Sequence, residues 1–315
     1  MWTNDLINGI AKIGRFYVLF FRYETKNSRF IKARRFDRIE CYRKVCHREM
    51  ISTAKAYIEA AGFNVFYSED ILLQDGQVAG TKEARIRTTN ALIHNKEVKA
   101  IWNIRGGYGS AEIVDRIDWD ALQAQPKWLI GFSDFTTFLS HAYEKGIPSI
   151  HAAMPVSFKK TNKDDLEATF EVLKYGPKSL ALTSAATPCS GKVIGGNLSV
   201  IYSIYGTPSL QTLEGTVLLL EDLDEYHYHL DRMLLALERK GAFNGVSAVL
   251  LGQFSDIHDH DTPLGDSVEH TLVKYFEAAG IPVLQNMPFG HTSKQFPIVI
   301  GSHAEISEHE IAFTL

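Results

Sequence analysis

Residues 127–136 read KWLIGFSDFT, and this stretch decides the fold class of the chain. Its first six residues are nearly all apolar, as expected for a strand buried on both faces of a parallel sheet. Helical periodicity follows from about residue 135 to 145 and ends at Gly146. A buried strand, a tight turn and a helix in this order predict an α/β fold with a parallel sheet.

Strands and helices alternate on both sides of this stretch. The periodicity predicts helices over residues 48–62, 81–94, 111–117, 163–175, 230–241 and 267–280. Predicted strands cover residues 63–68, 98–104, 149–155, 192–196, 216–222, 246–254, 282–286, 297–300 and 304–313. A chain of 315 residues is about twice the usual domain length, so we expect two α/β domains.

The predicted organisation has four parts. A basic segment covers residues 1–47, an N-terminal α/β domain covers 48–158, a linker covers 159–190, and a C-terminal α/β domain covers 191–315.

The composition excludes several classes of protein. Hydrophobic residues make up 45% of the chain and charged residues 22%, and the net charge is −4. These values exclude a disordered chain, a collagen-like chain and a coiled-coil rod. The sequence contains no apolar run of the roughly 18 to 20 residues that a membrane-spanning helix needs. Three cysteines are too few for a disulfide framework and are typical of a reducing compartment.

Charge is distributed unevenly along the chain. Residues 1–48 contain 12 Lys and Arg but 4 Asp and Glu, a net charge of +8, whereas residues 49–315 have a net charge of −12. A basic arm that binds nucleic acid or a membrane is one interpretation, and a targeting segment is another. A divergent start of the chain is a third.

Residues 131–136, GFSDFT, join a predicted strand to a predicted helix. Such a turn can present a serine hydroxyl above the strand ends, as in a nucleophile elbow. The usual G-x-S-x-G pattern is not met, because Phe135 stands at the second glycine position. The alternative is that Ser133 and Asp134 only cap the helix.

The loop RGGYG at residues 105–109 follows the preceding predicted strand. Successive glycines allow backbone N–H groups to approach a ligand, so the loop could hold a phosphate or an oxyanion. No Gly-Lys-Ser/Thr follows, and Glu112 replaces the third glycine of a dinucleotide-binding motif. A tight turn without a ligand is the alternative.

Acids lie at the end of one further predicted strand, and a histidine follows another. Glu221 and Glu225 lie in LEDLDE at residues 220–225, where one carboxylate could orient a histidine. His291 lies in PFGH at residues 288–291, and an imidazole titrates near neutral pH and can act as a general base. Both stretches are equally consistent with solvated loops.

Two histidine clusters, at residues 227–229 and 258–261, raise the question of a metal site. Neither has the H-E-x-x-H spacing of a zinc peptidase. Cys41, Cys46 and His47 have no second half that would complete a zinc site. We therefore expect no metal.

The order of the motifs resembles that of the LD-carboxypeptidase family, serine peptidases of the murein tetrapeptide carboxypeptidase type. The motifs are RGGYG at 105–109, GFSD at 131–134, GGN at 195–197, LEDLDE at 220–225 and PFGH at 288–291. The resemblance covers residues from about 48 to 315. It implies a flavodoxin- or Rossmann-like parallel-sheet domain followed by a mixed α/β domain of the swivelling β/α type.

The resemblance also implies roles for particular residues. Ser133 would be the nucleophile, His291 the general base, and Glu221 the residue that orients His291, with Glu225 as the alternative. Backbone N–H groups of Gly107 and Asp134 would form the oxyanion hole. Further residues would line the substrate cleft: Gly106, Asn197, Glu225 and Arg232.

The implied reaction is release of the terminal D-Ala from murein tetrapeptides during cell-wall recycling, without a metal or organic cofactor. The resemblance further implies a homodimer. Because the sequence shows no secretion signal, we expect a cytoplasmic location, and we expect no nucleic-acid or membrane partner. Two alternatives are a peptidase of the microcin-immunity type that cleaves a peptidyl- or aminoacyl-nucleotide toxin, and a muropeptide-binding relative without catalysis.

The chain departs from the family at its start, where a strand and a small-residue loop are usual. Residues 14–21, GRFYVLFF, could supply the strand, but the basic stretch that follows is foreign to the pattern. Without that strand, one edge of the first sheet would be exposed.

Overall fold

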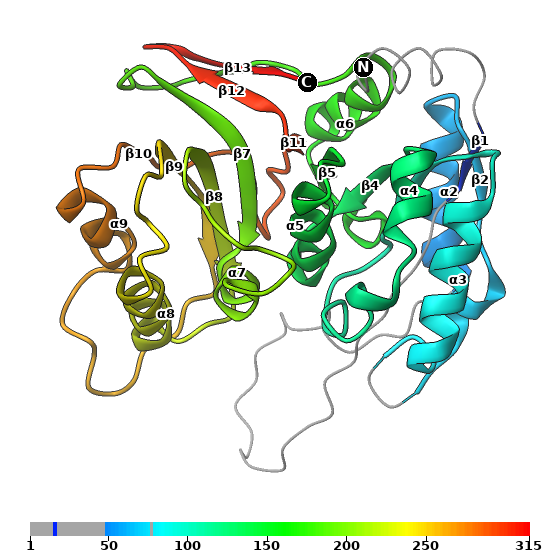
Figure 1. The fold of residues 1–315 in the computed structure, drawn as a ribbon, viewed down its shortest axis with the longest axis horizontal. Helices are drawn as coiled ribbons and strands as arrows, with labels where there is room; N and C mark the ends of the chain where they lie inside the picture. Colours follow the sequence, from blue (N-terminus) through cyan, green and yellow to red (C-terminus); the bar gives the residue numbers. More distant parts are fainter. Residues whose placement is uncertain (1–14, 18–47, 76–77) are drawn as a thin grey trace.

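The computed structural model describes residues 15–17, 48–75 and 78–315, and it contains two β-sheets with helices packed against them. Figure 1 shows the two sheets in separate halves of the molecule, with α5 between them. The predicted α/β class is confirmed. No helix within the described ranges is long and apolar enough to cross a membrane.

The first sheet has the strand order β11-β5-β4-β3-β1-β2. Its members are β1 (Arg15–Tyr17), β2 (Asn64–Phe66), β3 (Val98–Trp102), β4 (Trp128–Gly131), β5 (Ser149–His151) and β11 (Ile298–Ile300). Strands β1 to β5 are parallel in the order 2-1-3-4-5, which is the flavodoxin-like order. Strand β11 is antiparallel to β5, so a strand from the end of the chain completes the first sheet.

Strand β1 lies between β2 and β3 and pairs with both in parallel. Residues 15–17, within the stretch 14–21 that could supply the first strand, therefore do supply it. The other residues of the basic segment, and with them the arm and targeting interpretations, lie outside the described residues.

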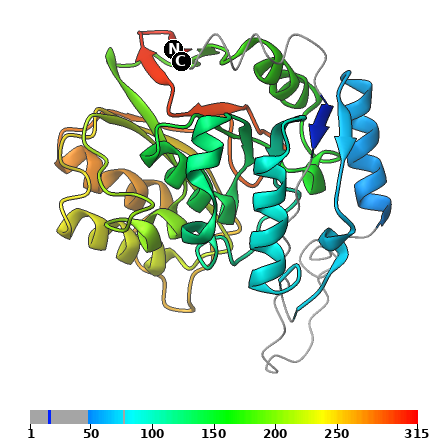
Figure 2. The ribbon, with the colours of Figure 1, turned by 45° about the vertical axis from the view of Figure 1, so that its right-hand side comes forward.

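Helices cover both faces of the first sheet, because each presents an apolar stripe to it. The helices of this half are α2 (Arg48–Ala60), α3 (Lys82–His94), α4 (Trp119–Ala124), α5 (Thr136–Glu144) and α6 (Lys163–Tyr175). One face is covered by α2 and α6, and Figure 2 shows α2 at the outer side of this half. The other face packs against α3, α4 and α5. Full burial of one aliphatic side chain between a helix and the sheet stabilises the folded state by about 1.5–3 kcal/mol.

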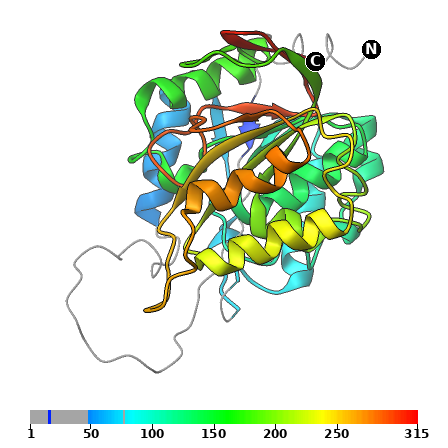
Figure 3. The ribbon, with the colours of Figure 1, turned by 90° about the vertical axis from the view of Figure 1, so that its left-hand side faces the viewer.

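The second sheet has the order β10-β9-β8-β7-β12-β13-β6. Its members are β6 (Leu180–Ala181), β7 (Cys189–Asn197), β8 (Thr216–Leu223), β9 (Ala248–Ser255), β10 (Val283–Leu284), β12 (His303–Ile306) and β13 (Glu310–Thr314). Strands β7 to β10 are parallel, whereas β12, β13 and β6 are antiparallel to their neighbours, so the sheet is mixed. The helices of this half are α7 (Leu198–Ile204), α8 (His227–Arg239) and α9 (Val268–Ala278). Figure 3 shows α8 and α9 side by side along one face of the sheet.

The two halves share one hydrophobic core. Buried residues of α5, among them Phe138 and Leu139, belong to the same cluster as Val193 of β7 and Ile201 of α7. The backbone also approaches closely at this contact. Gly196 has φ +141°, and a Cβ there would lie 2.6 Å from Thr136 Oγ1, so the junction requires a glycine. Packing of this kind fixes the carboxyl edges of the two sheets relative to each other.

Three local predictions were wrong or incomplete. Residues 111–117 do not form an α-helix: the chain makes a short 3₁₀ helix, Val114–Arg116, and α4 begins after Asp118, whose side chain accepts a hydrogen bond from the Ala121 N–H. The predicted strand over 304–313 is two antiparallel strands, β12 and β13. Helix α7 was not predicted.

Candidate active site

Ser133 lies at a strained turn between β4 and α5. Its φ is +62°, in the left-handed region that non-glycine residues rarely adopt, and it begins the 3₁₀ helix Ser133–Phe135. A Cβ at Gly131 would lie 2.7 Å from the Phe135 ring, so the ring occupies the space beside that glycine. The turn thus has the backbone strain of a nucleophile elbow, which is typical of functional sites.

The glycine loop, residues 105–110, lies beside this turn. A Cβ at Gly106 would be 2.8 Å from Ser133 Cβ and 2.9 Å from Ser133 Oγ, so the bare backbone of Gly106 touches the serine. Gly107 and Gly109 have φ of +131° and +113°. Only glycine adopts these angles readily, which explains the repeated glycines of the loop.

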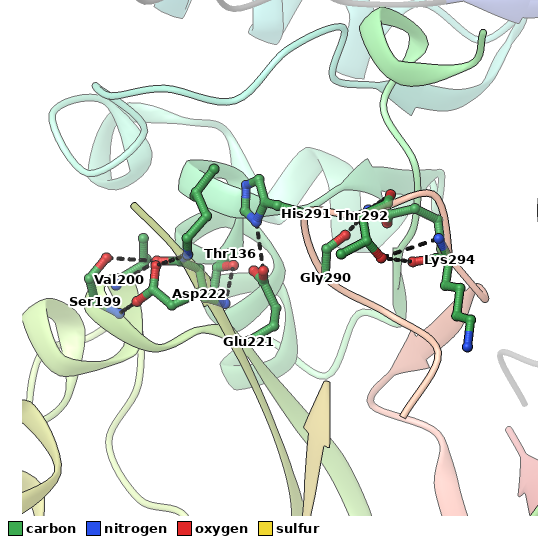
Figure 4. A network of polar contacts seen from close by, with 12 residues as sticks. Thr136, Ser199, Val200, Glu221, Asp222, Gly290, His291, Thr292 and Lys294 are labelled. Atoms are coloured by element: carbon green, nitrogen blue, oxygen red, sulfur yellow. Dashed lines mark hydrogen bonds and ion pairs between the residues drawn. The ribbon is translucent and has the colours of Figure 1, made fainter. Parts of the chain in front are cut away.

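His291 is held by a buried carboxylate from the second sheet. The His291 Nδ1 donates to Glu221 Oε2 at 2.7 Å (Figure 4), and the Glu221 side chain is completely buried. Because a carboxylate only accepts, the bond places the proton on Nδ1 and leaves Nε2 as the base nitrogen. A histidine oriented by a carboxylate is an arrangement suited to general acid–base catalysis.

A second buried carboxylate follows Glu221 directly. The pairing of β8 with β9 shifts register between Leu220 and Asp222, and such an irregularity can turn two consecutive side chains inward. Asp222 accepts hydrogen bonds from Asn197 Nδ2 at 2.7 Å and from the Ser199 N–H at 2.8 Å (Figure 4). Burial, and secondly the charge of Glu221, raise the pKa of Asp222 to about 7. Asp222 therefore ties β8 to the start of α7.

Ring contacts join His291 to the elbow. The Phe132 ring, next to Ser133 in the chain, packs on the His291 imidazole with centroids 4.6 Å apart. The histidine that Glu221 holds therefore packs against the residue that precedes Ser133, so the predicted serine, histidine and Glu221 belong to one region of the molecule.

His151, at the end of β5, is a buried histidine that was not predicted. Its ring contacts Phe132 and Phe289, each with centroids 5.7 Å apart. Neither of its ring nitrogens has a hydrogen-bond partner among the described residues. Burial lowers the pKa of His151 to about 4, opposed by the negative charge of Glu221. His151 is therefore a neutral ring near the site at physiological pH.

Other predicted site residues have different contacts. Glu225 bonds to His229, one helical turn away, with 2.6 Å between Oε2 and Nδ1, and so Glu221 rather than Glu225 contacts His291. The Arg232 guanidinium lies over the Tyr228 ring, 4.9 Å from its centroid. The Asn197 side chain caps α7 and bonds to Asp222. Substrate contacts for Asn197, Arg232 and Glu225 stay predictions.

The two histidine clusters lie beside each other, because the His227 N–H donates to the His258 carbonyl at 2.8 Å and His227 Nδ1 is 3.7 Å from Asp259 Oδ2. The Nε2 atoms of these two histidines have separate partners. His227 Nε2 bonds to Thr271 and His258 Nε2 bonds to Asp224. In the part of the chain that the structure describes, no group of three or more His, Cys, Asp or Glu side chains has the geometry of a metal site.

Asp222, His151 and Arg85 are among the buried polar residues near the site that sequence reasoning missed. Asp222 directly follows Glu221, but alternation along a strand would send its side chain to the opposite face. His151 and Arg85 lie in predicted elements, where the surrounding pattern carries no sign of function.

Comparisons with known proteins agree with this architecture. Residues 41–152 match the model of the LD-carboxypeptidase N-terminal domain, and residues 190–306 match that of the LD-carboxypeptidase C-terminal domain. A probable murein peptide carboxypeptidase of Bacillus subtilis is 28% identical over 274 residues, which are 82% of this chain and 85% of the relative. The murein tetrapeptide carboxypeptidase of Pseudomonas aeruginosa is 27% identical over 258 residues, 77% of this chain and 83% of the relative.

Two solved structures share the fold. The muramoyltetrapeptide carboxypeptidase from Oxalobacter formigenes superposes with a TM-score of 0.78 at 23% identity, covering 94% of this chain and 98% of that one. The microcin self-immunity protein MccF, in complex with aspartyl sulfamoyl adenosine, superposes with a TM-score of 0.80 at 19% identity, covering 96% and 97%. The two domain matches together span most of the sequence, in the order that the motifs predict, and the chain therefore belongs to the LD-carboxypeptidase family.

Proposed function

We propose that this protein is a serine carboxypeptidase that releases the terminal D-Ala from murein tetrapeptides. The observation that carries the proposal is the buried Glu221–His291 pair packed against the strained turn of Ser133. The names of the Bacillus and Pseudomonas relatives support a murein peptide as the substrate.

The geometry supports an acyl-enzyme mechanism. Ser133 Oγ attacks the carbonyl carbon before the terminal D-Ala, while His291 Nε2 takes the hydroxyl proton and Nδ1 keeps its hydrogen bond to Glu221. The carbonyl oxygen becomes an oxyanion, which backbone N–H groups of Gly107 and Asp134 stabilise. The tetrahedral intermediate then collapses, the C–N bond breaks, and His291 gives the proton to the leaving D-Ala amine. Water, deprotonated by His291, hydrolyses the ester and frees Ser133.

The division of the site between two sheets suits this reaction. Neutral imidazole becomes imidazolium when Ser133 attacks, and the buried Glu221 carboxylate stabilises that charge most strongly where water is excluded. The proposed oxyanion donors come from the other half of the molecule, on the glycine loop and the elbow. The cytoplasmic location and the homodimer stay predictions.

A second candidate function is cleavage of an aminoacyl-nucleotide toxin. It is favoured by the close superposition on MccF with a bound aspartyl sulfamoyl adenosine, although an identity of 19% supports a shared fold alone. The same serine chemistry would apply, with the scissile amide attached to a nucleotide analogue in place of D-Ala.

The test is mass spectrometry of a purified murein tetrapeptide incubated with the protein, with Ser133→Ala alongside. We expect the wild type to release one alanine and Ser133→Ala to release none. A parallel reaction with aspartyl sulfamoyl adenosine separates the two candidates. Cleavage of the nucleotide analogue without cleavage of the tetrapeptide would contradict the murein proposal. Cleavage of neither substrate by a folded protein would contradict both.

A further inference from the structure

The glycine loop is held against the elbow by a carboxylate next to the nucleophile. The Ser110 N–H donates to Asp134 Oδ2 at 3.0 Å. Asp134 as a residue is partly exposed, but its carboxyl group is enclosed, and burial raises its pKa. The hydrogen bonds from the loop and the positive charge of Arg85 act in the opposite direction. The Asp134 side chain, which directly follows Ser133 in the chain, is therefore hydrogen-bonded to the glycine loop.

Arg85 holds the same end of the loop from the side of α3. Its side chain is almost fully buried, with 3% exposed, and its Nη1 donates to the Gly109 carbonyl at 2.9 Å. Its Nη2 donates to Glu112 Oε2 at 2.8 Å, and this bond is the main reason why the pKa of Glu112 is lowered. A buried guanidinium is costly unless it is paired. Arg85 is paired with one backbone carbonyl and one carboxylate, and the carbonyl belongs to the glycine loop.

The contact between Arg85 and the loop has no spare room. A Cβ at Gly109 would lie 2.6 Å from Arg85 Nη1, so the guanidinium lies directly against the bare backbone of the loop. A planar guanidinium with fixed donor directions positions an acceptor more strictly than a lysine ammonium does. The carbonyl of Gly109 therefore has a well-defined place.

The opposite end of the loop is held as well. Asn103 Nδ2 donates to the Arg105 carbonyl at 2.9 Å. Gly106 lies against Ser133, as described above. Gly107 and Tyr108 lie between these contacts and the hydrogen bonds at Gly109 and Ser110. The part of the loop proposed to bind the oxyanion is therefore held at both ends.

We propose that Arg85 and Asp134 are positioning residues that hold the glycine loop at the distance from Ser133 at which the Gly107 N–H meets the oxyanion. This inference rests on the proposed function, because it concerns the same serine chemistry. Neither side chain takes part in bond making or breaking. Each acts through a hydrogen bond to the backbone of the loop, at Gly109 and at Ser110.

The experiment compares four variants. Arg85→Met removes both donors at a similar volume, and Arg85→Lys restores one donor. Asp134→Ala removes the acceptor for Ser110, whereas Asp134→Asn keeps an oxygen that can accept the same N–H. The matched control is Arg116→Met, because Arg116 is an exposed arginine that pairs with Glu83 of the same helix α3.

Two rates are measured for each variant. The first is kcat and KM for release of D-Ala from the tetrapeptide. The second is the rate at which a fluorophosphonate labels Ser133, a step in which an Oγ–P bond forms, the P–F bond breaks and fluoride leaves with the serine proton taken up by His291. The labelling rate needs no peptide substrate, so it tests the positioning roles even if the wild type does not cleave the tetrapeptide.

We expect Arg85→Met and Asp134→Ala to lower kcat and the labelling rate by about 10- to 100-fold, because a displacement of about 1 Å at an oxyanion donor has an effect of this size. KM should change by less than about threefold, since binding of the substrate ground state does not depend on that donor. Arg85→Lys should recover part of the rate, Asp134→Asn most of it, and Arg116→Met should equal the wild type.

Melting temperatures show which variants are folded at the assay temperature. The positioning role is wrong if folded Arg85→Met and Asp134→Ala label at the wild-type rate, or if KM alone rises. It is also wrong if Asp134→Asn falls as far as Asp134→Ala, because the charge rather than the accepted hydrogen bond would then matter. If Arg85→Met does not fold, Arg85→Lys and the Asp134 pair decide the question.

Discussion

The carboxyl edges of the two sheets contribute to the candidate site in different ways. The edge of the first sheet contributes backbone geometry: Ser133 with its positive φ and a glycine loop whose Gly106 touches it. The edge of the second sheet contributes buried charge, with Glu221 and Asp222 almost inaccessible to solvent and His291 bonded to the first of them. A strained backbone position costs about 1–3 kcal/mol and buried carboxylates must be hydrogen-bonded, so each edge depends on the packing behind it.

Because the two edges contribute different features, substitutions on them should impair the site in different ways. A change on the second edge alters the charge on His291 and leaves the serine in place. A change on the first edge displaces the serine or the oxyanion donors and leaves the histidine pair intact. Substitutions on each edge can therefore be told apart by which step of the reaction they slow.

The largest effect is expected at the buried carboxylate. Glu221→Gln keeps the shape of the side chain but removes the charge that stabilises the imidazolium, and its amide can present a donor to His291 Nδ1. We expect kcat for D-Ala release to fall by about 10³- to 10⁴-fold, as for the equivalent change in other serine triads. Steady-state kinetics on the folded variant measures it. A decrease in kcat of less than about tenfold would show that Glu221 does not stabilise the His291 imidazolium.

A smaller loss is expected on the first edge. Gly106→Ala places a Cβ 2.8–2.9 Å from the Ser133 side chain, so the serine or the loop must move. We expect the fluorophosphonate labelling rate to fall by about 100-fold, the usual effect of a displacement of about 1 Å. The control is Gly280→Ala, which has a positive φ of +69° but no atom within 4 Å of the added Cβ. Equal labelling rates in both variants would contradict contact between Gly106 and Ser133.

The pH dependence of stability tests the buried histidine between the two edges. The pKa of His151 is about 4 in the folded protein and 6.5 in an unfolded reference, so only the unfolded chain takes up this proton between these values. Folding should therefore lose stability as the pH falls from about 6.5 to about 4, by about 3 kcal/mol, and keep it above 6.5.

The measurement is denaturant unfolding of wild type and His151→Phe at several pH values. The free energy of unfolding of the wild type should fall relative to that of the variant as the pH drops through this window. Asp222, whose raised pKa acts in the opposite direction between about 4 and about 7, is present in both proteins and cancels. A constant difference from pH 7 to pH 4 would mean that His151 is not a buried neutral ring.

The smallest effect sharpens the assignment within the second edge. Glu225→Gln changes the bond to His229, a half-buried pair that does not include His291, so we expect kcat to stay within about threefold of wild type. The same kinetic assay compares it directly with Glu221→Gln. If the two variants lost activity equally, the assignment of Glu221 as the partner of His291 would be wrong.

Most secondary elements could be predicted because burial imposes a period on the sequence. The runs around β3, β4 and β8 are mostly apolar, as expected for strands covered on both faces, and α2 and α9 carry one apolar stripe each. Prediction was wrong at residues 111–117, where apolar residues with helical spacing form only a 3₁₀ turn. The 3₁₀ turn ends because Ile117 is extended, and α4 then begins after Asp118, which caps it.

The candidate site was predictable to the extent that its residues follow strands. Ser133, Glu221 and His291 each lie in a motif after an apolar strand, and carboxyl ends of parallel strands form the edge where α/β proteins place their sites. The bonds among them were not predictable. Glu221 and Glu225 have similar surroundings in the sequence, and an irregularity in the pairing of β8 with β9 accompanies the burial of Glu221.

From the sequence we could predict the α/β class, the order of most strands and helices along the chain, and the loops that carry the serine, the acids and the histidine. These features could be predicted because burial leaves a local pattern in the sequence, and because glycines mark turns whose backbone angles other residues rarely adopt. The tertiary structure alone decided that Glu221 meets His291 across 70 positions, that Asp134 and Arg85 hold the glycine loop, and that β11 joins the first sheet. Contacts between distant segments depend on how the two sheets pack around α5. No local sequence pattern specifies how far apart the sheets lie or how they are oriented.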